Sequence, residues 1–211
     1  MIAIIDYKAG NLTSVERAVR HLGHAVQVTD EPAAIRAAER IIFPGVGAAG
    51  RAMADLKALG LDLLLIEAFA AGKPILGICL GTQIIFDYSD ENTTPCLGLI
   101  PGRVRRFPEP LFDGPVRLKI PHMGWNRVAF IDRHPVFANI DPANEFYFVH
   151  SYYPEVAPGA EALIAGTTHY GFPFSSAVAR DNLVAVQFHP EKSGPGGLTL
   201  LDNFCGWRPA C

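Results

Sequence analysis

One stretch decides how this chain folds around a cysteine: Gly77-Ile78-Cys79-Leu80-Gly81-Thr82-Gln83. An apolar strand, Pro74 to Ile78, precedes Cys79, and a predicted helix, Leu80 to Tyr88, follows it. A side chain on such a tight turn points out of the sheet, where the first N–H groups of the helix have no intrahelical partner. Their partial positive charge favours a thiolate. The pattern predicts a nucleophilic cysteine, although a buried structural cysteine would also fit it.

A second segment, Val186-Gln187-Phe188-His189-Pro190-Glu191, supplies a base and a carboxylate. Its apolar start indicates a buried strand, in which alternate residues share a face. Gln187, His189 and Glu191 should therefore project to one side. Alone, His189 would fit a hydrogen-bonded core histidine, and Glu191 a solvated charge. Together with Cys79 they predict a Cys/His/Glu triad for acyl transfer, with His189 as the base and Glu191 as the carboxylate that orients it.

The third element is the short apolar strand Arg40 to Phe43, which runs into the glycine-rich loop Pro44-Gly45-Val46-Gly47. The loop lacks the P-loop pattern, so phosphate binding is not its expected use. A tetrahedral intermediate needs two N–H donors aimed at its oxyanion. We expect one donor from Leu80 at the start of the helix and the other from Val46 or Gly47. A plain turn is the alternative.

Three of these segments resemble the class I (triad) glutamine amidotransferases: Pro-Gly-Val-Gly at 44–47, Gly-Ile-Cys-Leu-Gly-x-Gln at 77–83 and Phe-His-Pro-Glu-Lys-Ser at 188–193. Three more narrow the resemblance to the glutaminase subunits of imidazole glycerol phosphate synthase: Asp6-Tyr7-x-x-Gly10-Asn11-Leu12, Pro121-His122-Met123-Gly124-Trp125-Asn126 and Phe146-Tyr147-Phe148-Val149-His150-Ser151-Tyr152-Tyr153. The similarity covers nearly the whole chain.

The resemblance implies an α/β fold in a single domain over residues 1–211: a flavodoxin-like three-layer sandwich with a mostly parallel central sheet and extra antiparallel strands. It implies a glutaminase that hydrolyses L-glutamine to glutamate and ammonia, with Cys79 as the nucleophile, His189 as the general acid and base and Glu191 as its partner. The ammonia would pass to a cyclase subunit, a (β/α)8 barrel, within a heterodimer of histidine biosynthesis. It implies no metal and no organic cofactor.

Glutamine-binding positions also follow from the resemblance: Gln83, Glu91, His150, Ser151 and Tyr152. The chemistry of the substrate is compatible with them. A carboxylate such as Glu91 suits the α-ammonium of glutamine, and N–H and hydroxyl donors around Ser151 suit its α-carboxylate. A solvated loop charge is the alternative for Glu91, because it lies in the polar run Asp90-Glu91-Asn92-Thr93-Thr94.

Positions expected at the partner interface are Asn11, Trp125, Tyr147 and Lys192. Tryptophan and tyrosine are enriched at interfaces and often supply much of the binding energy. For Trp125 the alternative is an ordinary semi-buried aromatic side chain. We therefore expect the cyclase to dock close to the triad, so that ammonia moves between active sites without meeting bulk water.

Three residues depart from the pattern that is usual in the family. Lys8 stands where glycine is usual, Ala49 where phenylalanine is usual and Thr82 where methionine is usual. Lys8 places a bulky cation in a loop that we expect near the oxyanion strand. Thr82 lies in the helix after Cys79 and could alter its packing, but it removes none of the triad groups.

The composition is that of an ordinary globular protein. The chain has 211 residues, of which 49% are hydrophobic and 18% charged, and its formal charge of −3 gives no reason to expect nucleic acid as a partner. No stretch reaches the ~20 apolar residues of a membrane span. The N-terminus lacks a secretory n-region, and the four cysteines show no zinc spacing. We therefore expect a cytoplasmic location and reduced thiols.

Strands and helices alternate in the first and last parts of the chain, which predicts a parallel sheet with helices on both faces. The expected strands are Ile2 to Ile5, Ala25 to Val28, Arg40 to Phe43, Pro74 to Ile78 and Leu183 to Phe188. The expected helices include stretches around Arg51 to Ala58, Leu61 to Ala71 and Leu198 to Phe204. Between Leu99 and Val178, β-prone runs separated by proline and glycine predict added antiparallel strands and long loops.

Three alternative functions stay open. One is a redox or binding protein on the same fold, in which the cysteine is oxidised rather than acylated; the presence of both His189 and Glu191 argues against it. Another is a triad hydrolase of esters or peptides, which would differ only in its pocket. The third is the glutaminase subunit of another biosynthetic amidotransferase, in the anthranilate or pyridoxal phosphate pathways. Glutamate release from glutamine and copurification with a barrel cyclase would separate them.

Overall fold

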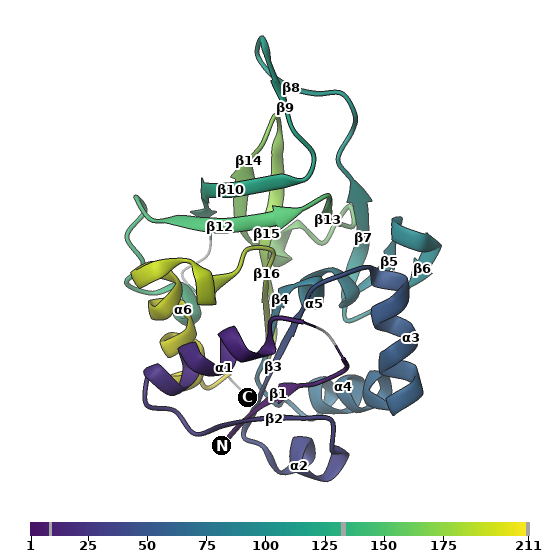
Figure 1. The fold of residues 1–211 in the computed structure, drawn as a ribbon, viewed down its shortest axis with the longest axis vertical. Helices are drawn as coiled ribbons and strands as arrows, with labels where there is room; N and C mark the ends of the chain where they lie inside the picture. The colour runs from purple at the N-terminus through teal and green to yellow at the C-terminus, as the bar shows by residue number, and fades with distance from the viewer. Residues whose placement is uncertain (9, 132–133, 210–211) are drawn as a thin grey trace.

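An eight-stranded sheet runs through the computed structural model, which describes residues 1–8, 10–131 and 134–209 (Figure 1). In spatial order its strands are β11 (Ala129–Phe130), β14 (Ile164–His169), β15 (Pro173–Arg180), β16 (Leu183–Val186), β4 (Ile75–Cys79), β3 (Arg40–Gly45), β1 (Ile2–Ile5) and β2 (Val26–Thr29). Strands β16 to β2 are parallel, and β11, β14 and β15 add antiparallel pairs. The order β2-β1-β3-β4-β16 is flavodoxin-like, as predicted.

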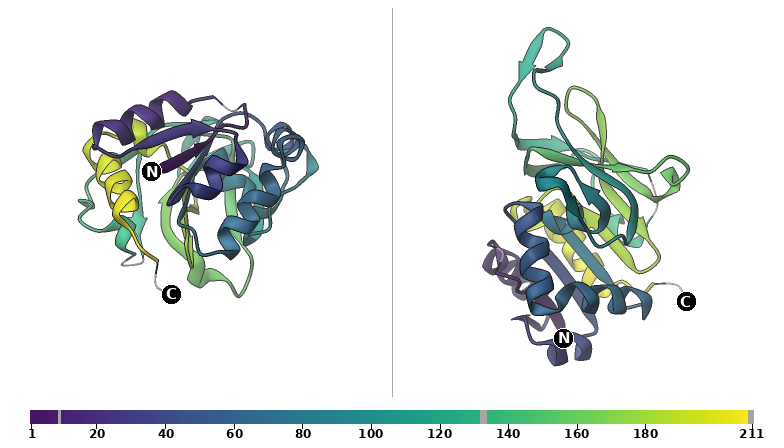
Figure 2. Two further views of the ribbon diagram at one scale, coloured as in Figure 1. Left: turned by 90° about the horizontal axis from the view of Figure 1, so that it is seen from below. Right: turned by 90° about the vertical axis from the view of Figure 1, so that its right-hand side faces the viewer.

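Helices cover both faces of the sheet (Figures 1 and 2). On one face lie α1 (Leu12–His21) and α6 (Gly194–Gly206); on the other lie α2 (Pro32–Ala37), α3 (Ala49–Leu59) and α4 (Leu61–Ala70). Alternate residues of β1 explain the two layers. Ile2 and Ile4 pack into the core under α1 and α6, and Ala3 and Ile5 into the core under α3 and α4.

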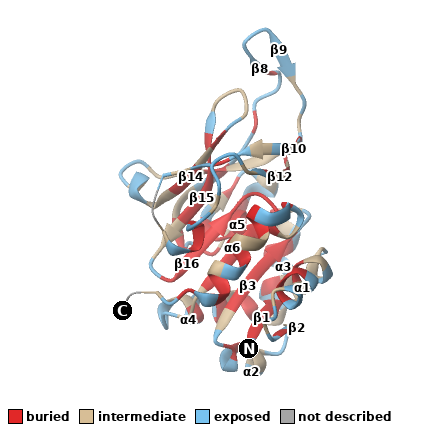
Figure 3. Cartoon of the chain, turned by 90° about the vertical axis from the view of Figure 1, so that its left-hand side faces the viewer, coloured by how far each residue is buried: buried red, intermediate tan, exposed pale blue. Residues whose placement is uncertain are grey.

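The buried residues concentrate in the middle of the sheet (Figure 3). All residues of β4 and β16 are buried, because helices or further strands cover both of their faces. Strands buried on both sides read as continuous apolar runs, which is why their positions could be predicted closely. The carboxyl ends of β3, β4 and β16 therefore emerge side by side from a rigid base, where open α/β sheets bind their ligands.

Antiparallel strands between residues 99 and 178 build the upper part of the molecule (Figures 1 and 2). The smaller sheets contain β10 (His122–Arg127) and β12 (Glu145–His150); β13 (Tyr152–Val156), β7 (Ile100–Arg106), β5 (Phe86–Ser89) and β6 (Thr94–Pro95); and β8 (Leu111–Asp113) and β9 (Val116–Leu118). The hairpin β8–β9 projects away from the body of the molecule. The strands between residues 99 and 178 pair antiparallel with one another, as predicted for this region, whereas β5 pairs with β7 in parallel.

The helix predicted over Leu80 to Tyr88 is wrong beyond its first turn. The structure has a short helix, α5 (Leu80–Ile84), followed by strand β5, which pairs with β6 and β7. The apolar run at 84–86 fits the period of a helix or of a strand, and periodicity alone cannot separate them. The tertiary pairing of these residues with β6 and β7 makes them a strand.

The strand predicted over Leu183 to Phe188 ends at Val186 for a similar reason. The N–H of Gln187 still bonds to Ser176 of β15, but the N–H of His189 bonds to the carbonyl of Tyr147 in β12, at 2.9 Å. The chain thus leaves the main sheet at Gln187 and joins a second one. No helix in the described part of the chain is long and apolar enough to cross a membrane.

Candidate active site

Cys79 is the last residue of β4 and lies at the tight turn into α5. Its backbone has φ 54° and ψ −106°, a strained conformation for a residue with a side chain. Close packing holds it there. A Cβ atom on Gly81 would lie 1.8 Å from the carbonyl oxygen of Phe43, and one on Gly77 would lie 2.9 Å from Cβ of Ala185. The predicted elbow is therefore present, with glycines where the neighbouring strands leave no room.

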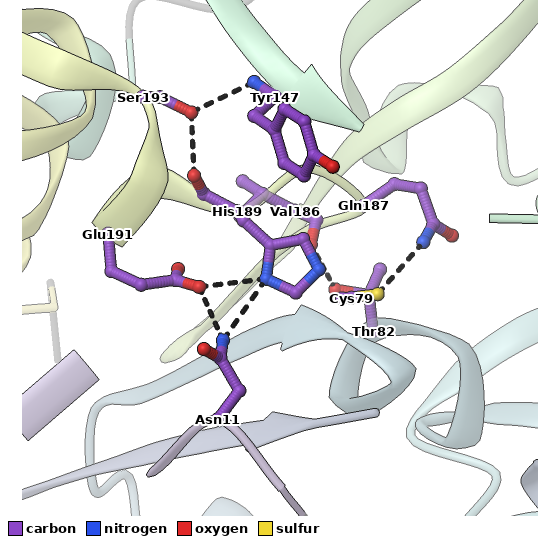
Figure 4. Close-up of polar contacts among 9 residues, drawn as sticks. All are labelled: Asn11, Cys79, Thr82, Tyr147, Val186, Gln187, His189, Glu191 and Ser193. Atoms are coloured by element: carbon purple, nitrogen blue, oxygen red, sulfur yellow. Dashed lines mark hydrogen bonds and ion pairs between the residues drawn. The ribbon is translucent and has the colours of Figure 1, made fainter. Parts of the chain in front are cut away.

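His189 lies between Cys79 and Glu191 (Figure 4). Its Nδ1 is 2.8 Å from Oε1 of Glu191, and both side chains are buried. Because a carboxylate oxygen can only accept, Nδ1 carries a proton. The other ring nitrogen, Nε2, faces Cys79. Burial lowers the pKa of His189, but the neighbouring Cys79 and Glu191 outweigh burial and raise this pKa to about 9. Both neighbours therefore favour the imidazolium form of His189.

Ser193 and β12 hold the backbone on which His189 sits. The hydroxyl of Ser193 donates to the His189 carbonyl at 2.6 Å and accepts from the N–H of Tyr147 at 3.0 Å. The N–H of His189 completes the arrangement by bonding to Tyr147. Ser193 belongs to the quoted motif at 188–193, but the sequence alone suggested no task for it.

Asn11 contacts the same carboxylate. Its Nδ2 lies 2.5 Å from Oε1 of Glu191 and 3.4 Å from Nδ1 of His189. Asn11 adopts a left-handed conformation immediately before α1, which turns its amide toward the triad. The sequence prediction placed Asn11 at a partner interface; the structure gives its side chain a contact inside the predicted triad, from the opposite end of the chain.

A cavity of about 380 Å³ opens beside Cys79. Its lining includes every residue predicted for the oxyanion hole and for glutamine: Val46, Gly47, Leu80, Gln83, Glu91, His150, Ser151 and Tyr152. The carboxylate of Glu91 is anchored at the start of α3, because its Oε2 accepts the N–H of Ala49 at 2.8 Å. In the described chain, no group of three His, Cys, Asp or Glu side chains could hold a metal ion.

His150 forms part of the cavity wall, but its ring nitrogens already have partners. Nδ1 lies 2.7 Å from the carbonyl of Tyr152, and Nε2 lies 2.9 Å from Nδ1 of His122. Burial lowers the pKa of His150 to about 3 and that of His122 to about 4. Both rings are therefore neutral at physiological pH. His122 stands in the quoted motif at 121–126, but the sequence assigned no role to it.

The other expected interface residues form one cluster. Trp125 and Tyr147 are paired across β10 and β12, with ring centroids 6.0 Å apart, and Nζ of Lys192 lies 5.9 Å from the Tyr147 ring. Trp125 is 54% exposed, which excludes the semi-buried alternative. The Tyr147 ring in turn lies 6.4 Å from that of His189. An exposed aromatic surface thus adjoins the predicted triad.

Known proteins resemble the chain over nearly its full length. A family model described as glutamine amidotransferase class-I matches residues 3–206. Imidazole glycerol phosphate synthase subunit HisH of Maridesulfovibrio salexigens is 53% identical, over 97% of this chain and 95% of its own. HisH of Thiobacillus denitrificans is 49% identical, over 99% and 92%. The structure of PurLQS from Thermotoga maritima, 16% identical over 97% of both chains, has the same fold, with a TM-score of 0.71. The chain therefore belongs to the class-I glutamine amidotransferases and, among them, to the HisH subunits of imidazole glycerol phosphate synthase.

Proposed function

We propose that this glutaminase hydrolyses L-glutamine with Cys79 as the nucleophile, His189 as the general acid and base, and Glu191 as the group that orients His189. One observation carries the proposal: the buried His189 ring lies between Glu191 and Cys79, and Cys79 lines a cavity of about 380 Å³. Glu191 favours the imidazolium form of His189, and an imidazolium beside a cysteine stabilises a thiolate.

The first half of the reaction forms a thioester. The thiolate attacks the side-chain amide carbon of glutamine, so that a C–S bond forms and the amide oxygen takes the negative charge. The N–H of Leu80 and that of Val46 or Gly47 donate to this oxyanion. His189 then gives its Nε2 proton to the amide nitrogen, the C–N bond breaks, and ammonia leaves.

The second half releases glutamate. His189 is now neutral and takes a proton from a water molecule as the water attacks the γ-glutamyl thioester. When the tetrahedral intermediate collapses, the C–S bond breaks, the electron pair returns to sulfur, and glutamate leaves. Glu191 stabilises the imidazolium in both halves.

The substrate is oriented by the far wall of the cavity. Glu91 receives the α-ammonium, and donors at Ser151 and Tyr152 receive the α-carboxylate. Both N–H groups of the Gln83 amide donate to protein acceptors. Its Oε1 is therefore the atom available to accept a hydrogen bond from the substrate. His150 contributes to this wall by hydrogen bonding to the Tyr152 carbonyl, which fixes the backbone beside the α-carboxylate site.

The partner that uses the ammonia is the cyclase HisF, a (β/α)8 barrel that forms a heterodimer with this chain. The exposed cluster of Trp125, Tyr147 and Lys192 supports docking beside the triad. Asn11, expected at the same interface, contacts Glu191, so docking there would act directly on the triad. Glutaminase turnover should be low for the isolated chain and rise when HisF binds its ribonucleotide substrate.

A labelling experiment tests the nucleophile. The protein is incubated with a glutamine analogue that carries a diazo or chloro electrophile, and the labelled peptide is identified by mass spectrometry. We expect the label on Cys79, and we expect Cys79→Ala to fold but to release no glutamate from glutamine. Labelling of Cys96 or Cys205 in place of Cys79 would overturn the assignment.

A further inference from the structure

Gln187 is fully buried beside the predicted nucleophile and uses the two ends of its carboxamide differently. Its Nε2 lies 3.8 Å from Sγ of Cys79, and its Oε1 lies 3.0 Å from Nε2 of Gln83. Figure 4 shows this amide pointing at the sulfur from the side away from His189. Sequence reasoning placed Gln187 on the same side as His189 but gave it no role.

The hydrogen-bond partners fix which end of the amide faces the sulfur. Nε2 of Gln83 also lies 3.0 Å from the carbonyl oxygen of Tyr152, which can only accept. The Gln83 atom at that position must therefore be nitrogen, and its second N–H reaches Gln187. The Gln187 atom that meets this N–H must then be oxygen, which leaves the Gln187 N–H directed at Cys79.

The same argument extends in the other direction. The Tyr152 carbonyl also accepts from Nδ1 of His150, so Nε2 of this neutral ring must accept from Nδ1 of His122. Nε2 of His122 in turn accepts from Nδ2 of Asn126, at 3.3 Å. In this hydrogen-bond network each side-chain amide and imidazole ring, from Asn126 on β10 to Gln187, has only one orientation that satisfies its partners. The amide of Gln187 is thus held by a network that cannot flip locally.

We propose that Gln187 donates a hydrogen bond to the thiolate of Cys79 and that Gln83 positions it for this task. The inference rests on the proposed role of Cys79. A buried anion is costly unless donors surround it, and a neutral amide supplies a donor without adding a second charge beside His189. A thiol gains much less from the same N–H, so the contact favours the reactive form of the cysteine.

The geometry gives this donor two uses in the reaction. Before attack it stabilises the resting thiolate and keeps the sulfur at one position. When the C–S bond of the second tetrahedral intermediate breaks, negative charge returns to Sγ, where the N–H of Gln187 is already in place. Gln187 therefore assists the departure of the thiolate as well as its formation.

The test compares the reactivity of Cys79 in Gln187→Met, which keeps the length of the side chain but removes the donor, with that in the wild type. The alkylation rate by iodoacetamide is followed from pH 5 to pH 10 by mass spectrometry of the Cys79 peptide. We expect about tenfold slower alkylation at neutral pH and a half-maximal rate at a higher pH. The matched control is Gln27→Met, at an exposed position on the edge strand β2, which should behave as wild type.

Circular dichroism shows whether Gln187→Met folds. If it does not, Gln83→Met provides the second measurement, because it leaves the Gln187 amide in place but frees it to rotate; we expect a smaller shift in the same direction. A folded Gln187→Met whose profile coincides with wild type overturns the inference while Cys79 is still labelled by the glutamine analogue. Failure of that labelling in the wild type would instead overturn the proposed function.

Discussion

The hydroxyl of Thr82 donates a hydrogen bond to the backbone carbonyl of Val186, at a distance of 2.6 Å. Thr82 lies in α5 directly after the nucleophile, and Val186 ends the strand that leads to His189. The bond therefore ties together the two chain segments that carry the predicted nucleophile and base. It also gives a structural use to a residue that departs from the family pattern.

Thr82→Val should lower the free energy of unfolding by about 1–2 kcal/mol, because it removes a buried donor at nearly constant volume. Urea denaturation measures this change. Thr82→Ser keeps the hydroxyl and serves as the control, with a smaller loss that reflects one missing methyl group. A Thr82→Val protein as stable as wild type would show that the bond contributes nothing.

His189 and Glu191 should not act independently. His189→Ala should remove nearly all glutaminase activity, because no other group can protonate the departing ammonia. Adding Glu191→Gln to it should cost little more, since residues that act as a unit are strongly non-additive. Steady-state glutamate release gives the four rates of the cycle. A double mutant whose loss equals the product of the single losses would argue against a shared triad.

Asn11→Ala should reduce kcat about tenfold and leave KM for glutamine unchanged, because the Asn11 amide supports Glu191 and does not line the substrate cavity. Asn11→Asp should be more damaging, since it places a second carboxylate beside Glu191. The two variants are compared by full glutamine titrations. An increase in KM with unchanged kcat would assign Asn11 to substrate binding.

Acid should destabilise the protein through His122 and His150. Their pKa values in the folded chain, about 4 and about 3, lie below the ordinary value of 6.5, so the unfolded chain binds more protons as the pH falls. The stability present above pH 6.5 is therefore lost on acidification toward these values. His122→Gln should reduce the loss between pH 7 and pH 5 by about 2 kcal/mol, measured by urea denaturation at both pH values. An unchanged loss would mean that His122 is already protonated in the folded state.

Trp125→Ala should weaken binding to HisF by about 2 kcal/mol, or roughly 30-fold, if this exposed ring is an interface hot spot. Isothermal titration calorimetry with purified HisF measures the effect. Leu63→Ala is the control, because Leu63 is also exposed, at 63%, and belongs to α4, which lies away from β10 (Figure 1). Equal affinities for the two variants would remove Trp125 from the interface.

The sequence predicted the parts of the site that local rules control. Cys79 could be placed because an apolar strand, two glycines and a helix start are contiguous in the chain. The predicted cavity residues, such as Val46, meet Cys79 because β3 and β4 pair in register, with Gly45 opposite Cys79. That register follows from apolar runs that are buried on both faces.

The remaining contacts depend on pairings that no local pattern encodes. Thr82 meets Val186, Asn11 meets Glu191, and Gln83 meets Gln187 across more than a hundred residues of sequence. Strand β5 was predicted as helix because its short apolar run fits the period of either element, and only its pairing with β6 and β7 makes it a strand. Short polar side chains can serve as caps, surface groups or buried links, and only the assembled sheet decides among these uses.

The order of the strands also has a consequence during synthesis. Strand β16, which is made near the end of the chain, inserts between β4 and β15, two strands that leave the ribosome before it. Until then β4 has an unpaired edge, and Cys79 lacks the imidazole of His189. Until β16 fills it, this open edge can pair with strands of other chains, so aggregation during synthesis is a hazard of this strand order.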